Sequence, residues 1–200
     1  MARRQVNKGN PAAMLQLGFY YARGSYGLAP SRTKAAQLYR RAADLGYVQA
    51  MYKLGMVYET GIGVKLDMKE AVKYYRMAAN RGCADAQLSY GRLFHEGSSV
   101  TQQDYAEGAR LYKLAADQGL TSAEFNLGLG YVNGQGVAED YAEASRWFER
   151  AAAKGDAQAA VALEKVGNLR AYCEALRAND AEMNAEMSRL LAMVGFGFEG

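Results

Sequence analysis

The stretch GQGVAEDYAEASRWFERAA, from Gly134 to Ala152, decides the fold because the chain repeats it. Related stretches lie at Gly24–Ala43, Gly61–Ala79 and Gly97–Ala116. A glycine loop that leads into a helix is typical of phosphate binding, since helix N-termini attract anions. Here the loop occurs in every copy, runs into an acidic residue such as Asp140, and lacks the Gly-Lys-Ser/Thr ending of a phosphate loop. We therefore predict that it is a turn of a repeated scaffold.

A second block precedes each loop and has the same period. Its copies are AMLQLGFYY from Ala13, AMYKLGMVY from Ala50, AQLSYGRLF from Ala86 and AEFNLGLGY from Ala123. The equivalent glycines, separated by 36 or 37 residues, are Gly18, Gly55, Gly91 and Gly128. Four copies are complete and a fifth begins at Asp156. A period of this length indicates a repeat architecture.

Each copy reads as two helices, A and B, joined by the glycine loop. In helix A of the second copy, Ala50, Leu54 and Tyr58 are four residues apart and share one face. Helix B begins after Asp67, and the spacing to Glu70 matches a capping box, in which each side chain accepts from a free backbone N–H of the first turn. The glycine at the end of each helix B suits a left-handed C-terminal cap.

The glycine inside each helix A costs about 1 kcal/mol relative to alanine, so its recurrence indicates a geometric need. We expect it to let a neighbouring helix approach closely, with the Ala-Ala step of helix B, such as Ala78-Ala79, as its partner. The large residues before that step, such as Tyr74-Tyr75, would fill the space on either side. Because such a hairpin cannot bury its own core, the predicted fold is an all-α solenoid of antiparallel helix pairs.

These residues resemble the Sel1-like repeat, a relative of the tetratricopeptide repeat with a longer loop, through the pattern A-x-x-x-L-G-x-x-Y-x-x-G-x-G-V-x-x-D-x-x-x-A-x-x-[WY]-[YF]-x-x-A-A-x-x-G. The matching copies are Ala50–Gly82 and Ala123–Gly155. The resemblance implies repeats at about 10–46, 47–82, 83–119 and 120–155, a partial fifth at 156–166, a basic tail at 1–9 and C-terminal capping helices at 167–200. The third copy departs from the pattern at Ser98-Ser99, where the second loop glycine is missing, and its loop is expected to sit differently.

After the fifth helix A the repeat pattern stops. Two further helices are expected, at Leu169–Ala178 and Asp180–Val194. They could cap the open end of the solenoid, or the second could dock a partner with Phe196 and Phe198 as anchors.

Composition narrows the classes of partner and location. With 24 basic and 21 acidic residues, the formal net charge of +3 does not call for a nucleic acid or an anionic membrane. No apolar run is long enough for an integral membrane segment, and no signal peptide is visible. A cytoplasmic location is expected for the chain as written, or a periplasmic or secreted one if a signal peptide was removed. The oligomeric state stays open.

Few residues indicate catalysis or the binding of a metal or cofactor. His95 is the only histidine, and Cys83 and Cys173 lie far apart, so neither a metal nor a cofactor is expected. A weak hydrolase could pair Ser98 or Ser99 with His95, although no third catalytic group is evident. Some disulfide-rich members of the family are associated with penicillin-like ligands, but they carry paired cysteines in each repeat, which this chain lacks.

The resemblance also implies where a partner would bind, since helix A lines the concave side of tetratricopeptide-like solenoids. The variable positions opposite the repeated apolar face are Gln16, Phe19, Arg23, Gln49, Lys53, Met56, Asp85, Ser89, Arg92, Glu96, Ser122, Asn126, Leu129 and Asn133. Lys53 and Arg92 could take carboxylates, and residues such as Phe19 could take apolar anchors. We expect a non-enzymatic adaptor, scaffold or regulator, of bacterial origin, that binds a protein or peptide there. An immunity protein that neutralises a secreted bacterial toxin is the alternative.

Overall fold

The computed structural model describes residues 5, 6 and 8–193, without the side chains of residues 172, 173, 184 and 186–193. Within these residues every regular element is a helix. In chain order the helices are α2 (Pro11–Arg23), α3 (Arg32–Asp44), α4 (Val48–Thr60), α5 (Met68–Ala79), α6 (Ala84–Glu96), α7 (Tyr105–Asp117), α8 (Thr121–Asn133), α9 (Tyr141–Ala153) and α10 (Ala157–Met193). Residues 1–4 and 7 of the predicted basic tail and the predicted anchors Phe196 and Phe198 lie outside the described part.

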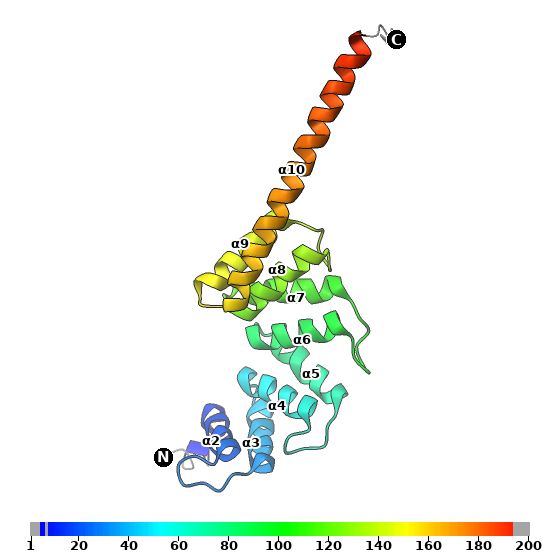
Figure 1. Ribbon diagram of the computed structural model, residues 1–200. Helices are drawn as coiled ribbons and strands as arrows, with labels where there is room; N and C mark the ends of the chain where they lie inside the picture. The colour runs from blue at the N-terminus through cyan, green and yellow to red at the C-terminus, as the bar shows by residue number, and fades with distance from the viewer. Residues whose placement is uncertain (1–4, 7, 194–200) are drawn as a thin grey trace.

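The helices stack as a row of hairpins, which confirms the all-α solenoid (Figure 1). Helices α2, α4, α6 and α8 are the A helices, and α3, α5, α7 and α9 are the B helices. Each helix packs mainly against the one before it and the one after it. As the periodicity predicts, Ala50, Leu54 and Tyr58 are all buried. The buried hydrophobic residues form three clusters that follow one another along the stack.

The close approach at the helix A glycines is confirmed, but the predicted partner was wrong. A side-chain carbon added at Gly55 would lie 2.7 Å from Cδ1 of Tyr75, and one added at Gly128 would lie 2.6 Å from Cε1 of Phe148. At the other two glycines, Gly18 and Gly91, the nearest atoms belong to Tyr39, at 2.4 Å, and Tyr112, at 3.0 Å. Each glycine thus receives the ring of the second residue in the large pair of its own helix B, because a flat ring fills the notch that an alanine methyl would leave empty.

Acidic caps begin the later B helices, but the capping box does not close. Oδ1 of Asp67 accepts from the backbone N–H groups of Lys69 and Glu70, at 3.0 and 3.2 Å. The Glu70 carboxylate does not reach back as predicted and instead pairs with Lys73 at 3.0 Å. The reason is that the backbone N–H of Asp67 already donates to the carbonyl of Tyr58, at 3.0 Å. This bond ties the end of each loop to helix A.

The second loop glycine allows two repeats to touch. A side-chain carbon at Gly136, whose φ is +77°, would lie 1.9 Å from the carbonyl oxygen of Tyr105 at the start of the preceding helix B. The loop therefore packs on the previous repeat, and the scaffold interpretation of its glycines is supported. In the third copy, Gly97 has φ 73° and ψ 167°, unlike the left-handed caps at the equivalent glycines, so this loop does run differently.

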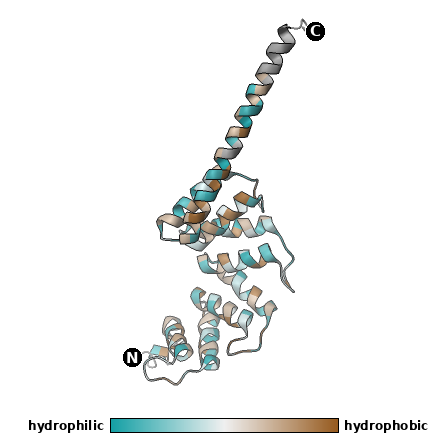
Figure 2. Ribbon diagram, viewed as in Figure 1, coloured by the Kyte–Doolittle hydropathy of each residue, from teal (hydrophilic) through white to brown (hydrophobic). Residues whose placement is uncertain are grey.

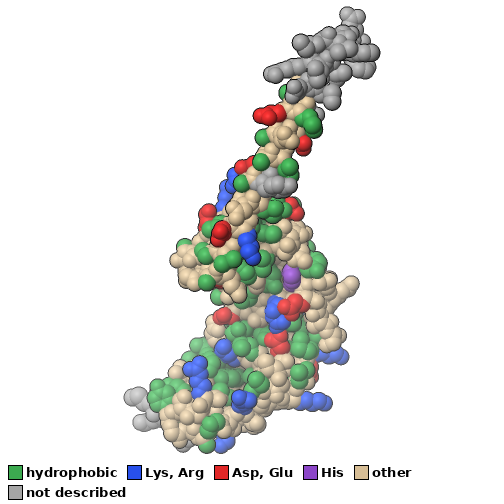
Figure 3. All heavy atoms as spheres, viewed as in Figure 1, with side chains coloured by type: hydrophobic (Ala, Val, Ile, Leu, Met, Phe, Trp, Pro, Cys, Tyr) green, Lys and Arg blue, Asp and Glu red, His purple; other side chains and the backbone are tan. Residues whose placement is uncertain are grey.

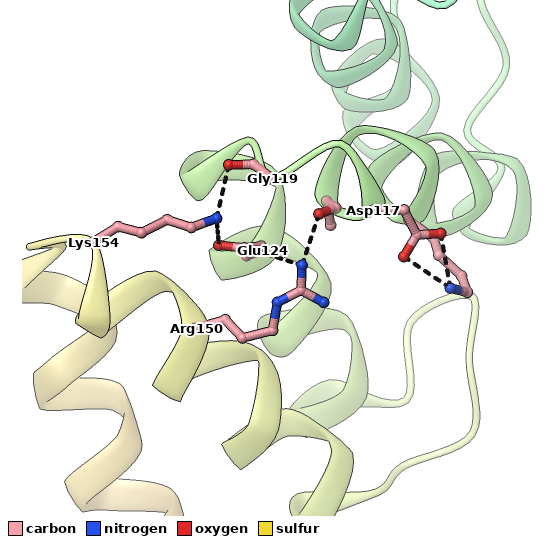
Figure 4. Close-up of polar contacts among 7 residues, drawn as sticks. Asp117, Gly119, Glu124, Arg150 and Lys154 are labelled. Atoms are coloured by element: carbon pink, nitrogen blue, oxygen red, sulfur yellow. Dashed lines mark hydrogen bonds and ion pairs between the residues drawn. The ribbon is translucent and has the colours of Figure 1, made fainter.

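A buried carboxylate joins the third and fourth repeats (Figure 4). Glu124 on α8 is fully buried, and its Oε2 accepts from Nζ of Lys154 at 2.8 Å. Its Oε1 lies 2.9 Å from Nη2 of Arg150, as an ion pair without the alignment of a hydrogen bond. Lys154 also donates to the carbonyl of Gly119 at 2.8 Å, so one side chain bridges the linker and the buried acid.

The C-terminal region differs from the prediction of separate helices. A single helix, α10, runs from Ala157 to Met193 and extends far beyond the solenoid (Figure 1). Its first turns take the place of a fifth helix A, where Ala159 and Val166 are buried against α9. The position of the close-approach glycine, 36 residues after Gly128, holds Glu164. The A-helix pattern is therefore interrupted at this position, and the helix continues to Met193.

Hydrophobic and hydrophilic residues are interspersed along the helices (Figure 2). In the described part of the chain, no helix is both long enough and apolar enough to cross a membrane.

Candidate functional site

The variable positions of the A helices lie on the surface, as the sequence predicts. None of the fourteen residues is buried, and the structure describes all of them. Six are exposed, and the other eight, including Phe19, Lys53 and Arg92, are partly covered. We call the surface formed by Phe19, Tyr52, Lys53, Met56, Glu59, Ser89, Arg92, His95 and Glu96 the A-helix face.

Lys53 lies between aromatic rings at one part of the A-helix face. Its Nζ is 5.5 Å from the ring centroid of Phe19 on α2 and 4.9 Å from that of Tyr52 on its own helix. It also lies 3.7 Å from the sulfur of Met56. Within the described part of the chain, Lys53 forms no ion pair, whereas Arg92 forms two. The ammonium group is thus held in place by rings and has no counter-charge of its own.

Tyr52 links the second and third repeats. Its ring lies 6.0 Å from that of Tyr75. Burial raises the pKa of the Tyr52 hydroxyl, the negative charge of Asp85 adds to the rise, and a side-chain hydrogen bond with Ser89 opposes it. The Asp85 and Ser89 positions, predicted as contact residues, therefore lie beside the ring that supports Lys53.

Glu59 is the centre of a polar network next to this cluster. Its Oε2 accepts from the Tyr75 hydroxyl at 2.5 Å, and its Oε1 pairs with Arg92 of the next repeat. Arg92 also binds Glu96, with Nη1 and Oε2 2.9 Å apart. Burial alone would lower the pKa of Arg92, but the hydrogen bond and charge of Glu59, together with Glu96, raise it. Burial and the bond to Glu59 raise the pKa of Tyr75.

His95 occupies the same position in the third repeat that Glu59 occupies in the second. Its Nε2 lies 3.2 Å from Oε1 of Gln135, and its ring packs edge-on against Tyr105 at 5.0 Å. In Figure 3 the histidine lies beside basic and acidic side chains on the visible face. Oγ of Ser98 accepts from the N–H groups of Val100 and Thr101, at 3.2 and 2.9 Å.

Among the described residues Ser98 and His95 form hydrogen bonds with other partners and not with each other, so the Ser98–His95 pair that a hydrolase would require is not formed in this structure. Among the residues that the structure describes, no group of three His, Cys, Asp or Glu side chains could hold a metal ion.

The predicted positions fall into separate groups. Phe19, Lys53 and Met56 come together, as do Arg92 and Glu96, whereas Oε1 of Gln49 lies 3.9 Å from Sγ of Cys83. At the N-terminal end, an open cavity of about 500 Å³ is lined by Gln16, Phe19, Tyr20, Arg23, Ser25 and Tyr26. In the fourth repeat, Leu129 packs against the core around α9. Ser122, Asn126 and Asn133 are not buried and lie on α8, away from these groups.

Sequence reasoning missed Tyr52, Glu59, Tyr75 and Gln135. Tyr52 falls at a repeat position that is apolar in every copy, so it reads as core. Glu59 could have been found, because its position holds Ala22, His95 and Val132 in the other repeats and therefore varies. Gln135 comes from a loop, and a helical pattern gives no information about the direction of a loop side chain.

Comparison with known proteins agrees with the repeat fold. Residues 11–47, 48–83, 84–120 and 121–156 match the model of the Sel1 repeat. The chain is similar to the crystal structure of a Sel1 repeat protein from Oxalobacter formigenes, with a TM-score of 0.74 and 35% identity, over 78% of this chain and 63% of that one. It is also similar to a protective antigen of uropathogenic Escherichia coli strains that displays the SLR fold, with a TM-score of 0.76 and 36% identity, over 79% of this chain and 33% of that one.

Among curated proteins, the chain is 32% identical over 161 residues to the chitin synthase regulator SKT5 of Saccharomyces cerevisiae. The match covers 79% of this chain and 23% of that relative. The chain thus spans about a quarter of the length of this relative, and the rest of the relative has no counterpart in this chain.

Proposed function

Because the chain belongs to the Sel1 repeat family, we propose that it is a non-enzymatic adaptor that binds a partner protein or peptide along the A-helix face. The observation that carries the proposal is Lys53, a cation fixed between Phe19 and Tyr52 without a carboxylate of its own. A pre-positioned cation next to apolar surface is suited to bind an acidic residue flanked by apolar ones.

The surrounding residues make this part of the face more suitable than the rest. Arg92 is already neutralised by Glu59 and Glu96, so it fixes the neighbouring repeats and leaves Lys53 as the available charge. Phe19 and Met56 are only partly covered and can add apolar contact area. The rings also limit the motion of Lys53, so less side-chain entropy is lost when a carboxylate binds.

The regulator name of the SKT5 relative supports an interaction role and no particular partner. The engaged side chains of Ser98 and His95 favour a binding module over a hydrolase. The toxin-immunity and penicillin-binding alternatives, and the location in the cell, stay predictions.

The test is a quantitative affinity capture with full-length protein. We expect Lys53→Glu to lose the protein that wild type captures from the source cell, because the new carboxylate repels an acidic residue. Lys69→Glu is the matched control, since Lys69 is an exposed lysine at the start of a B helix. It should retain capture. Equal capture by both variants, with unchanged melting temperatures, would refute binding at this face.

A further inference from the structure

The second repeat shows what a carboxylate does beside the ring that packs on a helix A glycine. Oε2 of Glu59 accepts a hydrogen bond from the Tyr75 hydroxyl at 2.5 Å, and Oε1 pairs with Arg92. Tyr75 is fully buried, and a buried tyrosine hydroxyl needs a hydrogen-bond partner. Glu59 is therefore the acceptor that this ring requires.

The third and fourth repeats also match the ring to its neighbour. In the third repeat His95 takes the place of the glutamate, and its ring centroid lies 6.0 Å from that of Tyr112. In the fourth repeat both members are apolar, because Val132 takes the glutamate position and Phe148, which has no hydroxyl, takes the ring position. In these repeats a ring hydroxyl thus occurs where a polar side chain stands next to it.

The first repeat breaks this match. Tyr39 keeps the ring hydroxyl, but Ala22 stands at the glutamate position. Within the described chain the Tyr39 hydroxyl forms no hydrogen bond, and its oxygen is open to solvent although the residue as a whole is only 5% exposed. The first repeat therefore has a donor without an acceptor, at the place where the second repeat holds a carboxylate.

A cation lies beside this hydroxyl. Burial raises the pKa of Tyr39 to about 12, and the positive charge of Arg23 opposes the rise, so the guanidinium group is close enough to act on the hydroxyl. In the part of the chain that the structure describes, Arg23 forms no ion pair. A carboxylate placed here would engage both groups, just as Glu59 engages a hydroxyl and a guanidinium group in the second repeat.

An open cavity of about 500 Å³ adjoins Arg23, and the rings of Phe19, Tyr20 and Tyr26 form part of its lining. The centroids of the Tyr20 and Tyr26 rings are 4.4 Å apart. Tyr26 is 81% exposed and has a φ of +58°, a backbone conformation that a tyrosine rarely adopts. The loop thus holds an aromatic ring in solvent as a wall of this cavity, which suits the cavity to an apolar side chain.

Phe19 connects the cavity with the cation of the proposed function, since its ring centroid lies 5.5 Å from Nζ of Lys53 and 5.7 Å from the centroid of the Tyr39 ring. We propose that the partner segment brings two carboxylates and one apolar side chain to this part of the face. One carboxylate pairs with Lys53. The other accepts from Tyr39 and Arg23, in the place that Glu59 holds in the second repeat, and the apolar side chain enters the cavity. This inference rests on the proposed function, because the first carboxylate is the one that Lys53 binds there.

Fluorescence polarisation with labelled synthetic peptides and the full-length chain tests the proposal. The probes carry two glutamates separated by one to three residues, one of which is phenylalanine. Matched peptides carry glutamine in place of either glutamate. We expect wild type to bind at least one probe, and each replacement to raise the Kd of that probe by about tenfold, because a charged hydrogen bond is lost. No binding of any probe at about 1 mM protein would overturn the proposal.

Ala22→Glu gives the first repeat the carboxylate that the second repeat has. The new side chain should engage Tyr39 and Arg23 itself, and so raise the Kd of the two-glutamate probe by about tenfold. The matched control is Asn133→Glu, which adds the same charge at an exposed position of α8 and should keep the Kd within a few-fold of wild type. Thermal unfolding checks that both variants keep the wild-type fold.

Removal of the two groups gives the complementary result. Tyr39→Phe and Arg23→Gln should each weaken the two-glutamate probe by several-fold, and should leave unchanged the matched peptide that lacks the second carboxylate. Lys53→Glu separates this inference from the proposed function. If Lys53→Glu has no effect while Ala22→Glu weakens binding, the proposed role of Lys53 fails and the second carboxylate site stands. If Ala22→Glu and Asn133→Glu have equal effects, the second carboxylate site fails and the role of Lys53 stands.

Discussion

The ring of Phe148 occupies the space that a side chain at Gly128 would need, with Cε1 2.6 Å from the position of the missing carbon. The same contact, between a helix A glycine and a helix B ring, recurs in all four repeats. It is the contact that sets how closely the two helices of each hairpin approach.

Gly128→Ala should therefore destabilise the protein by about 1–3 kcal/mol, because the buried Phe148 ring must shift. Gly130→Ala, two residues further along the same helix, is the control. Its nearest neighbour would be the carbonyl oxygen of Gln135 at 3.4 Å. That variant should be neutral or more stable by up to about 1 kcal/mol, since alanine favours the helix. Urea unfolding measures both, and equal effects would contradict the ring contact.

The buried ion cluster should respond asymmetrically to substitution. Removing both cations, Arg150→Ala with Lys154→Ala, leaves the fully buried Glu124 unpaired and should cost about 3 kcal/mol or more. Glu124→Met should cost less than about 1 kcal/mol. In that variant the two cations, which are 46% and 38% exposed, can be hydrated, and Met51 already fills the equivalent place in the second repeat. Denaturant unfolding of both variants would show the order, and a reversed order would exclude this account.

Of the two residues of the predicted capping box of α9, Asp140 and Glu143, only Asp140 caps the helix. Asp140→Ala should cost about 1 kcal/mol, because Oδ1 of Asp140 accepts from two backbone N–H groups of the first turn. Glu143→Ala should change stability by less than about 0.5 kcal/mol, since Glu143 makes only a surface pair with Arg146. If the two changes had similar cost in thermal unfolding, a closed capping box would have to be present in solution.

Stability should fall in alkaline solution because of buried tyrosines. Burial, and then the charge of Glu96, raise the pKa of Tyr112 to about 12 from its ordinary value of 10.0. Between these values the unfolded chain loses the hydroxyl proton and the folded chain keeps it, so ionisation favours the unfolded state as pH rises through 10 towards 12. Tyr112→Phe should weaken this dependence, and Phe148 shows that phenylalanine fits the equivalent place. Urea titrations between pH 9 and 11.5 measure the free energy of unfolding at each pH. If Tyr112→Phe has the same slope of this free energy against pH as wild type, Tyr112 is ruled out as a source of the pH dependence.

Much of the fold could be predicted from the sequence because the same constraints occur four times. The residues that set the helix boundaries and the glycine contacts recur at the repeat spacing in the sequence. So do those of the buried face that holds Ala50, Leu54 and Tyr58. The sequence led us to pair the helix A glycine with the small alanines of helix B. In the structure an aromatic ring of helix B packs on the glycine, because a flat ring fills the space left by the missing side chain.

The candidate site could be predicted less well, since it depends on contacts between repeats that are not periodic. Exposure of the A-helix positions followed from the helical pattern. The pairing of Glu59 with Arg92 and the placement of Lys53 between two rings did not, because both depend on the stacking angle of successive hairpins. The continuity of α10 was also missed, although Glu164 at the glycine position was a readable sign.

Glu164 has a consequence for how this chain can change in length during evolution. Each joint between hairpins uses only its immediate neighbours, so duplication or loss of a 36- or 37-residue unit inside the row would leave the other joints intact. Past α9 the same joint is interrupted, because Glu164 stands at the position where the other A helices hold the glycine that receives a ring. Units can therefore be gained or lost within the row while α10 keeps its attachment to the last hairpin.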